Sequence, residues 1–216
     1  MATSQVRAVF LDALGTLVEL DPPWVHLAAE LDVEADDALV RAVRKEMAYY
    51  KEHSHEGRDP DSVAALRARC ADILSWELNR EVPVETMMAS IRFRAYPDVA
   101  PALADLRSRG LRLVCVSNWD VSLTEVLERC GLDGLLDGVV TSAGSGSRKP
   151  DPVIFSQALE IAGCSAGEAL HVGDTAEEDV AGADSAGIRA LLLDREGGGD
   201  IRSLAEVANT LTGGGP

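Results

Sequence analysis

Residues 8–16 read Ala-Val-Phe-Leu-Asp-Ala-Leu-Gly-Thr, so a run of four apolar residues ends at a carboxylate, Asp12, and a Gly-Thr pair follows it closely. Continuous rather than alternating apolarity is typical of a strand that is covered on both faces, as the strands of parallel sheets are. Parallel sheets bind their ligands at the carboxyl ends of the strands. The stretch therefore predicts an α/β protein that places Asp12 at the ligand-binding edge of its sheet.

The same apolar pattern recurs along the chain. Five short runs have the length of strands, and they lie at residues 6–11, 111–116, 138–141, 169–172 and 189–193. Helical patterns occur at residues 99–109, 121–130, 153–162, 177–186 and 201–211. Strands that alternate with helices predict right-handed crossovers and a parallel sheet. We therefore expect a Rossmann-like core built on such a sheet.

One long segment breaks this alternation. From about Leu20 to Phe93 we find no strand pattern, and helical periodicity runs through residues 24–31, 37–52, 61–78 and 84–93. The sequence Gly-Arg-Asp-Pro at residues 57–60 marks a break between two of these helices. We therefore predict an α-helical cap inserted after the first strand, with the cap at residues 20–93 and the core at residues 1–19 and 94–216.

The composition narrows the class of partners. The 216 residues are 46% hydrophobic, which is enough for a sizeable core, and the formal net charge is −16. So acidic a chain repels phosphate backbones and anionic membrane surfaces, so neither nucleic acid nor a membrane is expected as a partner. The sequence has no run of 18 apolar residues, no signal-peptide layout at its start, and four cysteines with no metal-binding spacing. We expect a cytoplasmic protein with reduced thiols, monomeric or homodimeric.

Polar residues gather where the predicted strands end. They are Asp12 after the first strand, Ser117 and Asn118 after the second, Lys149 before the helix that follows the third, and Asp174 and Asp179 after the fourth. A carboxylate attacks phosphorus to form an aspartyl-phosphate, and this reaction needs positive charge and hydrogen-bond donors fixed around the phosphoryl oxygens. Mg²⁺ prefers oxygen ligands, so Asp12, Asp174 and Asp179 predict a Mg²⁺ site. The set as a whole indicates phosphoryl transfer.

The order and spacing of these residues resemble the four motifs of the haloacid dehalogenase superfamily. The motifs match residues 12–16, Ser117 in Val-Ser-Asn, Lys149 in Lys-Pro-Asp-Pro, and Asp174 after a glycine with Asp179 following. The match covers nearly the whole chain, and the helical insertion looks like the helical cap of the family's phosphatases, dehalogenases and phosphonatases. The resemblance implies a hydrolase, and we favour a Mg²⁺-dependent phosphatase that acts on a small phosphorylated molecule.

The resemblance also implies a role for each matching residue. Asp12 is expected to be the nucleophile and a metal ligand, and the backbone carbonyl of Leu14 is expected to be a second ligand. The remaining roles are phosphoryl binding by Ser117 and Lys149 and completion of the metal site by Asp174 and Asp179.

Leu14 departs from the family pattern. Phosphatases of the family usually carry a second aspartate two residues after the nucleophile, which protonates the leaving group and later activates water. Losing such a group typically costs about 10²–10⁴-fold in rate. Dehalogenases and phosphonatases also lack this aspartate, so a carbon–halogen hydrolase stays open as an alternative, as does a degenerate member that only binds a phosphorylated ligand or a protein. The pair Asp174 and Asp179 weighs against a dehalogenase, which needs no metal, and the cap lysines Lys45 and Lys51 show no sign of the activation that a phosphonatase requires.

Several residues near the motifs have two interpretations. Thr16 either bonds the phosphoryl group or closes its turn, and Asn118 either lines the pocket or is an ordinary loop residue. One of Glu178 and Asp179 serves the metal, and we favour Asp179 because the other acid suits the first turn of a helix. The cap stretch at residues 47–55, which includes Tyr50, His53 and His55, either reads the substrate or only packs, and Trp119 has the same two interpretations.

Overall fold

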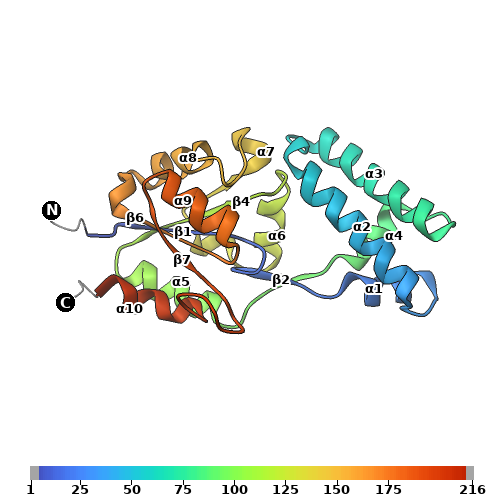
Figure 1. The fold of residues 1–216 in the computed structure, drawn as a ribbon, viewed down its shortest axis with the longest axis horizontal. Coiled ribbons are helices and arrows are strands. Elements are labelled where there is room, and N and C mark those ends of the chain that lie inside the picture. The colour runs from blue at the N-terminus through green and yellow to red at the C-terminus, as the bar shows by residue number, and fades with distance from the viewer. Residues whose placement is uncertain (1–4, 213–216) are drawn as a thin grey trace.

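A computed structural model describes residues 5–212 of the chain and contains a five-stranded parallel sheet (Figure 1). The strand order is β5-β4-β1-β6-β7, and every neighbouring pair is parallel. The strands are β1 (Ala8–Leu11), β4 (Arg112–Ser117), β5 (Gly138–Thr141), β6 (Ala169–Gly173) and β7 (Arg189–Leu192). Each of the five apolar runs overlaps one of these strands, and the predicted α/β fold is confirmed.

The central strand, β1, is buried on both faces. Val9 and Leu11 belong to one hydrophobic core, and Ala8 and Phe10 belong to another on the opposite face. Successive side chains of a strand point to opposite faces, so a strand between two cores has apolar residues on both faces. This is why the run before Asp12 contains no polar residue.

Helices cover both faces of the sheet (Figure 1). On one face lie α8 (Val153–Ala162) and α9 (Ala181–Ser185). On the other lie α5 (Val99–Ser108), α6 (Leu123–Arg129) and α10 (Val207–Thr212). Short helical segments fill the connections, namely η2 (Asp133–Leu135), α7 (Ser142–Ser145), η3 (Ala166–Glu168) and η5 (Leu204–Glu206). The core therefore has three layers, with the sheet in the middle.

The register of the central strands brings the motif residues to one edge of the sheet. Leu11 pairs with Cys115 of β4 and with Val172 of β6. Asp12, the next residue, donates its backbone N–H to the carbonyl oxygen of Val172 at 2.9 Å. Because the strands are parallel, Asp12 lies beside the ends of β4 and β6, and Ser117 is the last residue of β4.

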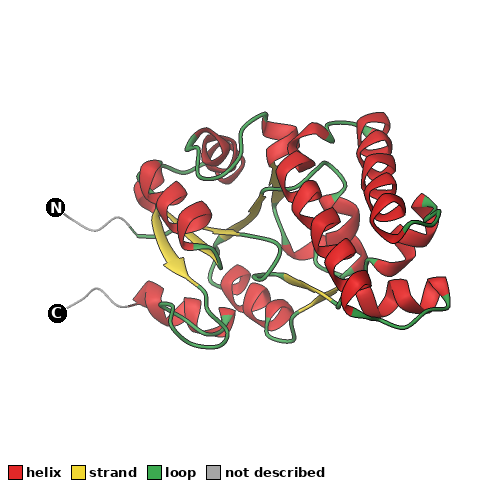
Figure 2. Ribbon diagram, turned by 45° about the vertical axis from the view of Figure 1, so that its right-hand side comes forward, coloured by secondary structure: helices red, strands yellow, loops and turns green. Residues whose placement is uncertain are grey.

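Four helices form the cap, which packs around a hydrophobic core of its own (Figure 2). They are α1 (Pro23–Leu31), α2 (Asp37–His53), α3 (Pro60–Leu78) and α4 (Val84–Ser90), with the short η1 (Ser54–Glu56) after α2. Two short strands join the cap to the core, β2 (Val18–Leu20) and β3 (Phe93–Ala95), and they pair antiparallel. The predicted helical cap inserted after the first strand of the sheet is therefore confirmed.

The β2–β3 ribbon corrects two details of the sequence analysis. We expected helix through residue 93 and no strand between Leu20 and Phe93, yet α4 ends at Ser90, and Leu20 pairs with Phe93 in the ribbon. A three-residue strand is too short to show an alternating pattern, and its partner lies far away in the sequence. The division into a cap at residues 20–93 and a core at 1–19 and 94–216 stays a prediction, with the ribbon lying across both boundaries.

The helix predicted at residues 177–186 differs at its start. It begins as a π-helical turn, η4 (Ala176–Val180), and continues as α9. Such wide turns occur often at functional sites, and this one carries three consecutive acids, of which Asp179 is buried. The four cysteines are free thiols. Within residues 5–212 no helix has the length and apolarity that a membrane crossing requires.

Candidate active site

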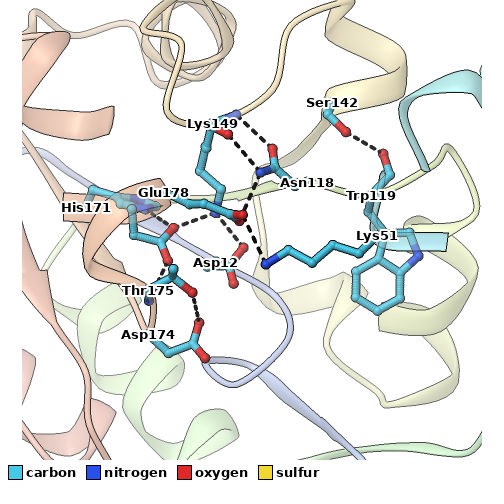
Figure 3. A network of polar contacts seen from close by, with 11 residues as sticks. Asp12, Lys51, Asn118, Trp119, Ser142, Lys149, His171, Asp174, Thr175 and Glu178 are labelled. Atoms are coloured by element: carbon cyan, nitrogen blue, oxygen red, sulfur yellow. Dashed lines mark hydrogen bonds and ion pairs between the residues drawn. The ribbon is translucent and has the colours of Figure 1, made fainter. Parts of the chain in front are cut away.

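Lys149 and Asp12 meet in the interior although 137 positions separate them. The Lys149 ammonium donates to Asp12 Oδ1 at 2.6 Å and to Asp179 Oδ1 at 2.5 Å (Figure 3). Lys149 is only 2% exposed and Asp12 8%. A buried ammonium must be paired to be tolerated, and here two carboxylates share it. The structure therefore brings three of the predicted site residues into one hydrogen-bonded group.

Asn118 fixes the backbone of Lys149. Its side-chain Oδ1 accepts the Lys149 backbone N–H at 2.8 Å, and its Nδ2 donates to the Lys149 carbonyl oxygen at 3.0 Å. Nδ2 also donates to Glu178 Oε2 at 3.1 Å. Asn118 therefore has a structural role, because its side chain holds the backbone at Lys149 against the end of β4.

Asp179 is fixed by three donors. Its Oδ1 accepts from Lys149 and from Nε2 of His171 at 2.9 Å, and its Oδ2 accepts the backbone N–H of Thr175 at 3.0 Å. A carboxylate only accepts, so the His171 ring must carry its proton on Nε2. His171 is fully buried in β6, and its ring meets Phe155 edge-on at 5.1 Å. The sequence analysis did not select His171, because a lone histidine within an apolar strand gives no signal of its partner.

The two carboxylates that share Lys149 are shifted in opposite directions. Burial, reinforced by repulsion from Asp179, raises the pKa of Asp12 despite its bond to Lys149. Burial also opposes the charge of Asp179, but a hydrogen bond from His171 and the attraction of Lys149 hold the pKa of Asp179 well below its usual range. For Lys149, burial disfavours the ammonium, yet both carboxylates together raise the pKa of Lys149. Lys149 therefore stays cationic between the two carboxylates.

A third carboxylate completes a cluster that is suited to a cation. One oxygen each from Asp12, Asp174 and Asp179 lies within 4.8 Å of the others. Burial, with repulsion from Asp12 and Asp179, raises the pKa of Asp174 to about 6. Gly15 has φ +82, and a Cβ there would collide with the Asp174 carboxylate, so this turn needs glycine. Three carboxylates facing one ammonium leave an excess of negative charge, which a divalent cation would relieve.

The hydroxyl groups predicted to bind the phosphoryl group lie beside Asp12. Ser117 is buried and stabilises the Asp12 carboxylate through a side-chain hydrogen bond. Thr16 is fully buried, and its Oγ1 has no hydrogen-bond partner among the described residues. A buried hydroxyl without a partner is costly, so Thr16 has a donor to offer to a ligand. The Leu14 side chain is 42% exposed, and its carbonyl as a metal ligand stays a prediction.

Comparison with known proteins identifies the family. A sequence model of haloacid dehalogenase-like hydrolases matches residues 6–187. The chain belongs to this family. Haloacid dehalogenase-like hydrolase domain-containing protein 3 of Mus musculus is 41% identical over 207 residues, which cover 88% of this chain and 82% of the mouse protein. Against four other curated relatives this hydrolase spans between 36% and 58% of the relative's length, so about half on average.

Solved structures share the architecture of this hydrolase over almost its full length. A HAD phosphatase from Thermococcus onnurineus is 26% identical, with a TM-score of 0.68 and coverage of 96% of this chain and 99% of the other. The L-2-haloacid dehalogenase from Xanthobacter autotrophicus is 22% identical, with a TM-score of 0.72 and coverage of 97% and 100%. At that identity the likeness to the dehalogenase concerns the fold alone.

The cap of this hydrolase is docked on the core beside the site. The Tyr50 hydroxyl donates to Asp120 Oδ2 at 2.8 Å, and Val121 donates its backbone N–H to the Gly57 carbonyl at 3.0 Å. Asp120 is 2% exposed and sits in the loop just after Asn118. Tyr50 therefore joins cap to core, a role that the sequence did not suggest.

The other aromatic and histidine candidates have protein partners. Trp119 is 6% exposed and packs against Phe93 at 5.2 Å, which supports the packing interpretation. The His53 ring bonds Glu56 at 2.6 Å and stacks on Tyr49. His55 is half-buried, and its Nδ1 has no partner within the described part of the chain. Lys51, which lies in the cap stretch at residues 47–55 that the sequence analysis considered for substrate contact, pairs with Glu178 of the core.

Proposed function

We propose that this chain is a Mg²⁺-dependent phosphatase that hydrolyses a small phosphorylated molecule through an aspartyl-phosphate at Asp12. The observation that carries the proposal is the buried group of Asp12, Lys149 and Asp179, with Asp174 completing the carboxylate cluster. A nucleophile held by an ammonium and flanked by acids that suit a divalent cation is the arrangement that phosphoryl transfer needs. The net charge of −16 also supports a small substrate over nucleic acid, and we keep the cytoplasmic location and the monomeric or homodimeric state as proposals.

The proposed reaction has two steps. A carboxylate oxygen of Asp12 attacks phosphorus and forms a P–O bond while the bond from phosphorus to the leaving oxygen breaks. The leaving group departs as an oxyanion and takes a proton from water, because Leu14 has none to give. Water then attacks the aspartyl-phosphate, which releases inorganic phosphate, restores Asp12 and passes a proton to solvent. Lys149 stays charged throughout and stabilises the phosphoryl oxygens, with Ser117 and Thr16 as hydroxyl donors.

The carboxylate cluster fits a bound Mg²⁺. Its donors are all oxygens, as Mg²⁺ prefers, and burial together with repulsion from Asp12 and Asp179 raises the pKa of Asp174. Asp12, Asp174, Asp179 and the carbonyl of Leu14 are the proposed ligands. When bound, the cation would neutralise charge on these carboxylates and on the phosphoryl oxygens.

The cluster also favours this proposal over its alternatives. A dehalogenase of this fold attacks carbon and needs no metal, so it has no use for Asp174 beside Asp12 and Asp179. A non-catalytic member has no need of a nucleophile buried against a lysine. Burying an ammonium and its carboxylates is costly, and a site that only binds achieves the same charge balance with fewer ionised groups.

A substrate panel tests the proposal directly. Aryl phosphates, acyl phosphates, sugar phosphates and 2-haloacids should each be assayed with and without Mg²⁺. We expect Mg²⁺-dependent release of inorganic phosphate by the wild type and none above background by a folded Asp12→Asn variant, since an amide neither attacks phosphorus nor holds the cation as well. Halide release without Mg²⁺ would favour the dehalogenase. Binding of phosphate esters with no turnover of any substrate would favour the non-catalytic alternative.

A further inference from the structure

Lys51 reaches from the cap to the edge of the active site. It lies in the last turn of α2, next to Tyr50, and its ammonium pairs with Glu178 Oε1 at 3.1 Å. Figure 3 shows the Lys51 side chain extended toward Glu178, which also accepts a hydrogen bond from Asn118. Glu178 belongs to η4, the turn that also carries Asp179. The ion pair therefore spans the gap between cap and core at the mouth of the site.

The residues around Lys51 hold its side chain in place but leave N–H donors of its ammonium available. The bond from Tyr50 to Asp120 fixes the end of α2, so the neighbouring lysine stem starts from a defined point. Glu178 is held by Asn118, so it stays in place whether or not Lys51 is paired with it. The Lys51 side chain is 64% exposed, and an ammonium has three N–H donors. Donors therefore remain for an incoming anion, and an exposed pair such as this is loosened at little cost.

The negative charge around Lys51 at the entrance to the site affects which substrates can bind. Four carboxylates line this region, those of Asp12, Asp174, Glu178 and Asp179, while Lys149 is already shared by two of them. A substrate whose organic part carries its own carboxylate would be repelled here unless a cation lay on the cap side. Among the described cap residues, Lys51 is the one whose ammonium pairs with a residue of η4.

We propose that Lys51 is a specificity-determining residue, and that it selects phosphorylated substrates whose organic part bears a carboxylate. The Lys51–Glu178 pair is the resting arrangement, and the substrate carboxylate adds a second ion pair to the same ammonium. This inference rests on the proposed function, because it assigns the substrate class of that same site. It differs from a phosphonatase role, since Lys51 forms no covalent bond.

The test compares two esters that differ in charge and little else, 3-carboxyphenyl phosphate and 3-carbamoylphenyl phosphate. Lys51→Met keeps the aliphatic stem and removes the charge, and Lys51→Arg keeps the charge. The matched control is Lys45→Met, since Lys45 lies on the same helix, is 61% exposed and pairs with Glu77 of the cap at 2.7 Å. Binding of the two corresponding phosphonates, which are not hydrolysed, is measured by calorimetry in parallel.

We expect the wild type to prefer the carboxylated ester in kcat/KM. Lys51→Met should lower kcat/KM for that ester by about 10–100-fold, the range for losing a hydrogen bond to a charged group, and should change the carbamoyl ester by less than about threefold. Lys51→Arg should keep most of the preference, and Lys45→Met should behave as the wild type. Equal losses on both esters, or no preference in the wild type, would overturn the inference.

The phosphonates separate failure of the inference from failure of the proposed function. Should the wild type hydrolyse neither ester nor any other phosphate of the panel, the phosphatase proposal fails. Calorimetry then decides the inference alone. Tighter binding of the carboxylated phosphonate that is lost in Lys51→Met supports the role of Lys51, and equal binding of both phosphonates by wild type and variant rejects it.

Discussion

Replacing Lys149 by methionine removes the charge at the centre of the site and keeps a side chain of similar length. In the wild type this ammonium is 2% exposed and serves both Asp12 and Asp179. The variant therefore leaves two buried carboxylates without their shared counterion. Breaking a buried ion pair by removing one partner costs about 3–5 kcal/mol, because the remaining charge stays uncompensated.

The predicted loss is large enough to measure by thermal unfolding. For a chain of this length one kcal/mol corresponds to a change of about 2–4 °C in Tm, so Lys149→Met should lower the Tm by about 6–20 °C without divalent cations. Mg²⁺ supplies positive charge to the same carboxylates and binds only the native state. It should therefore raise the Tm of the variant more than it raises that of the wild type.

Two controls assign the loss to the buried carboxylates. Lys45→Met removes a lysine whose pair with Glu77 is exposed, so it should cost at most about 1 kcal/mol. In an Asp12→Asn background one of the two carboxylates is already neutral, so Lys149→Met should cost less than it does in the wild type. A Lys149→Met protein within about 1 kcal/mol of the wild type, and equally responsive to Mg²⁺, would refute this account of the site.

Two further predictions concern pH and the leaving group. The folded-state pKa of Asp174 is raised from 3.8 to about 6, so ionising Asp174 costs the metal-free protein stability as the pH rises through this window, and that cost is absent below pH 3.8. Asp174→Asn should therefore raise the metal-free Tm at pH 8 but not at pH 4, and it should abolish the rise in Tm that Mg²⁺ causes. In the wild type the Mg²⁺-induced rise in Tm should become smaller below about pH 6. A wild-type rise that is the same at pH 5 and pH 8 would contradict this prediction. Because Leu14 supplies no proton, aryl and acyl phosphates should be hydrolysed much faster than alkyl phosphates, by up to about 10²–10⁴-fold, and Leu14→Asp should reduce the aryl-to-alkyl rate ratio in a folded variant. An alkyl phosphate turned over by the wild type as fast as an aryl one would mean that another residue donates the proton.

Local sequence patterns were enough to predict the sheet and the position of the motif residues at its edge. A strand buried on both faces is apolar at most positions, and the five runs are mostly apolar because helices cover both faces of the sheet. The polar residue that ends such a run is then necessarily at the edge of the sheet. For this reason the sequence predicts that Asp12, Ser117 and Asp174 lie close together at that edge.

Local pattern failed where a feature depends on a partner far away in the sequence. The β2–β3 ribbon is too short to have a periodicity, and its pairing of Leu20 with Phe93 exists only because the cap leaves and re-enters the core there. His171 reads as one polar residue in an apolar strand. Its role depends on a hydrogen bond to Asp179, which the π-helical turn brings back onto the strand.

The sequence by itself determined the fold class, the family motifs and the candidate site residues, because those depend on apolar runs and on the residues that directly follow them. The tertiary structure decided how charge is distributed among them. It buried Lys149 between two carboxylates, set Asn118 to hold the lysine backbone, and brought Lys51 from the cap to Glu178. These are contacts between separate elements, and their energies depend on distance and burial, which exist only once the chain has folded.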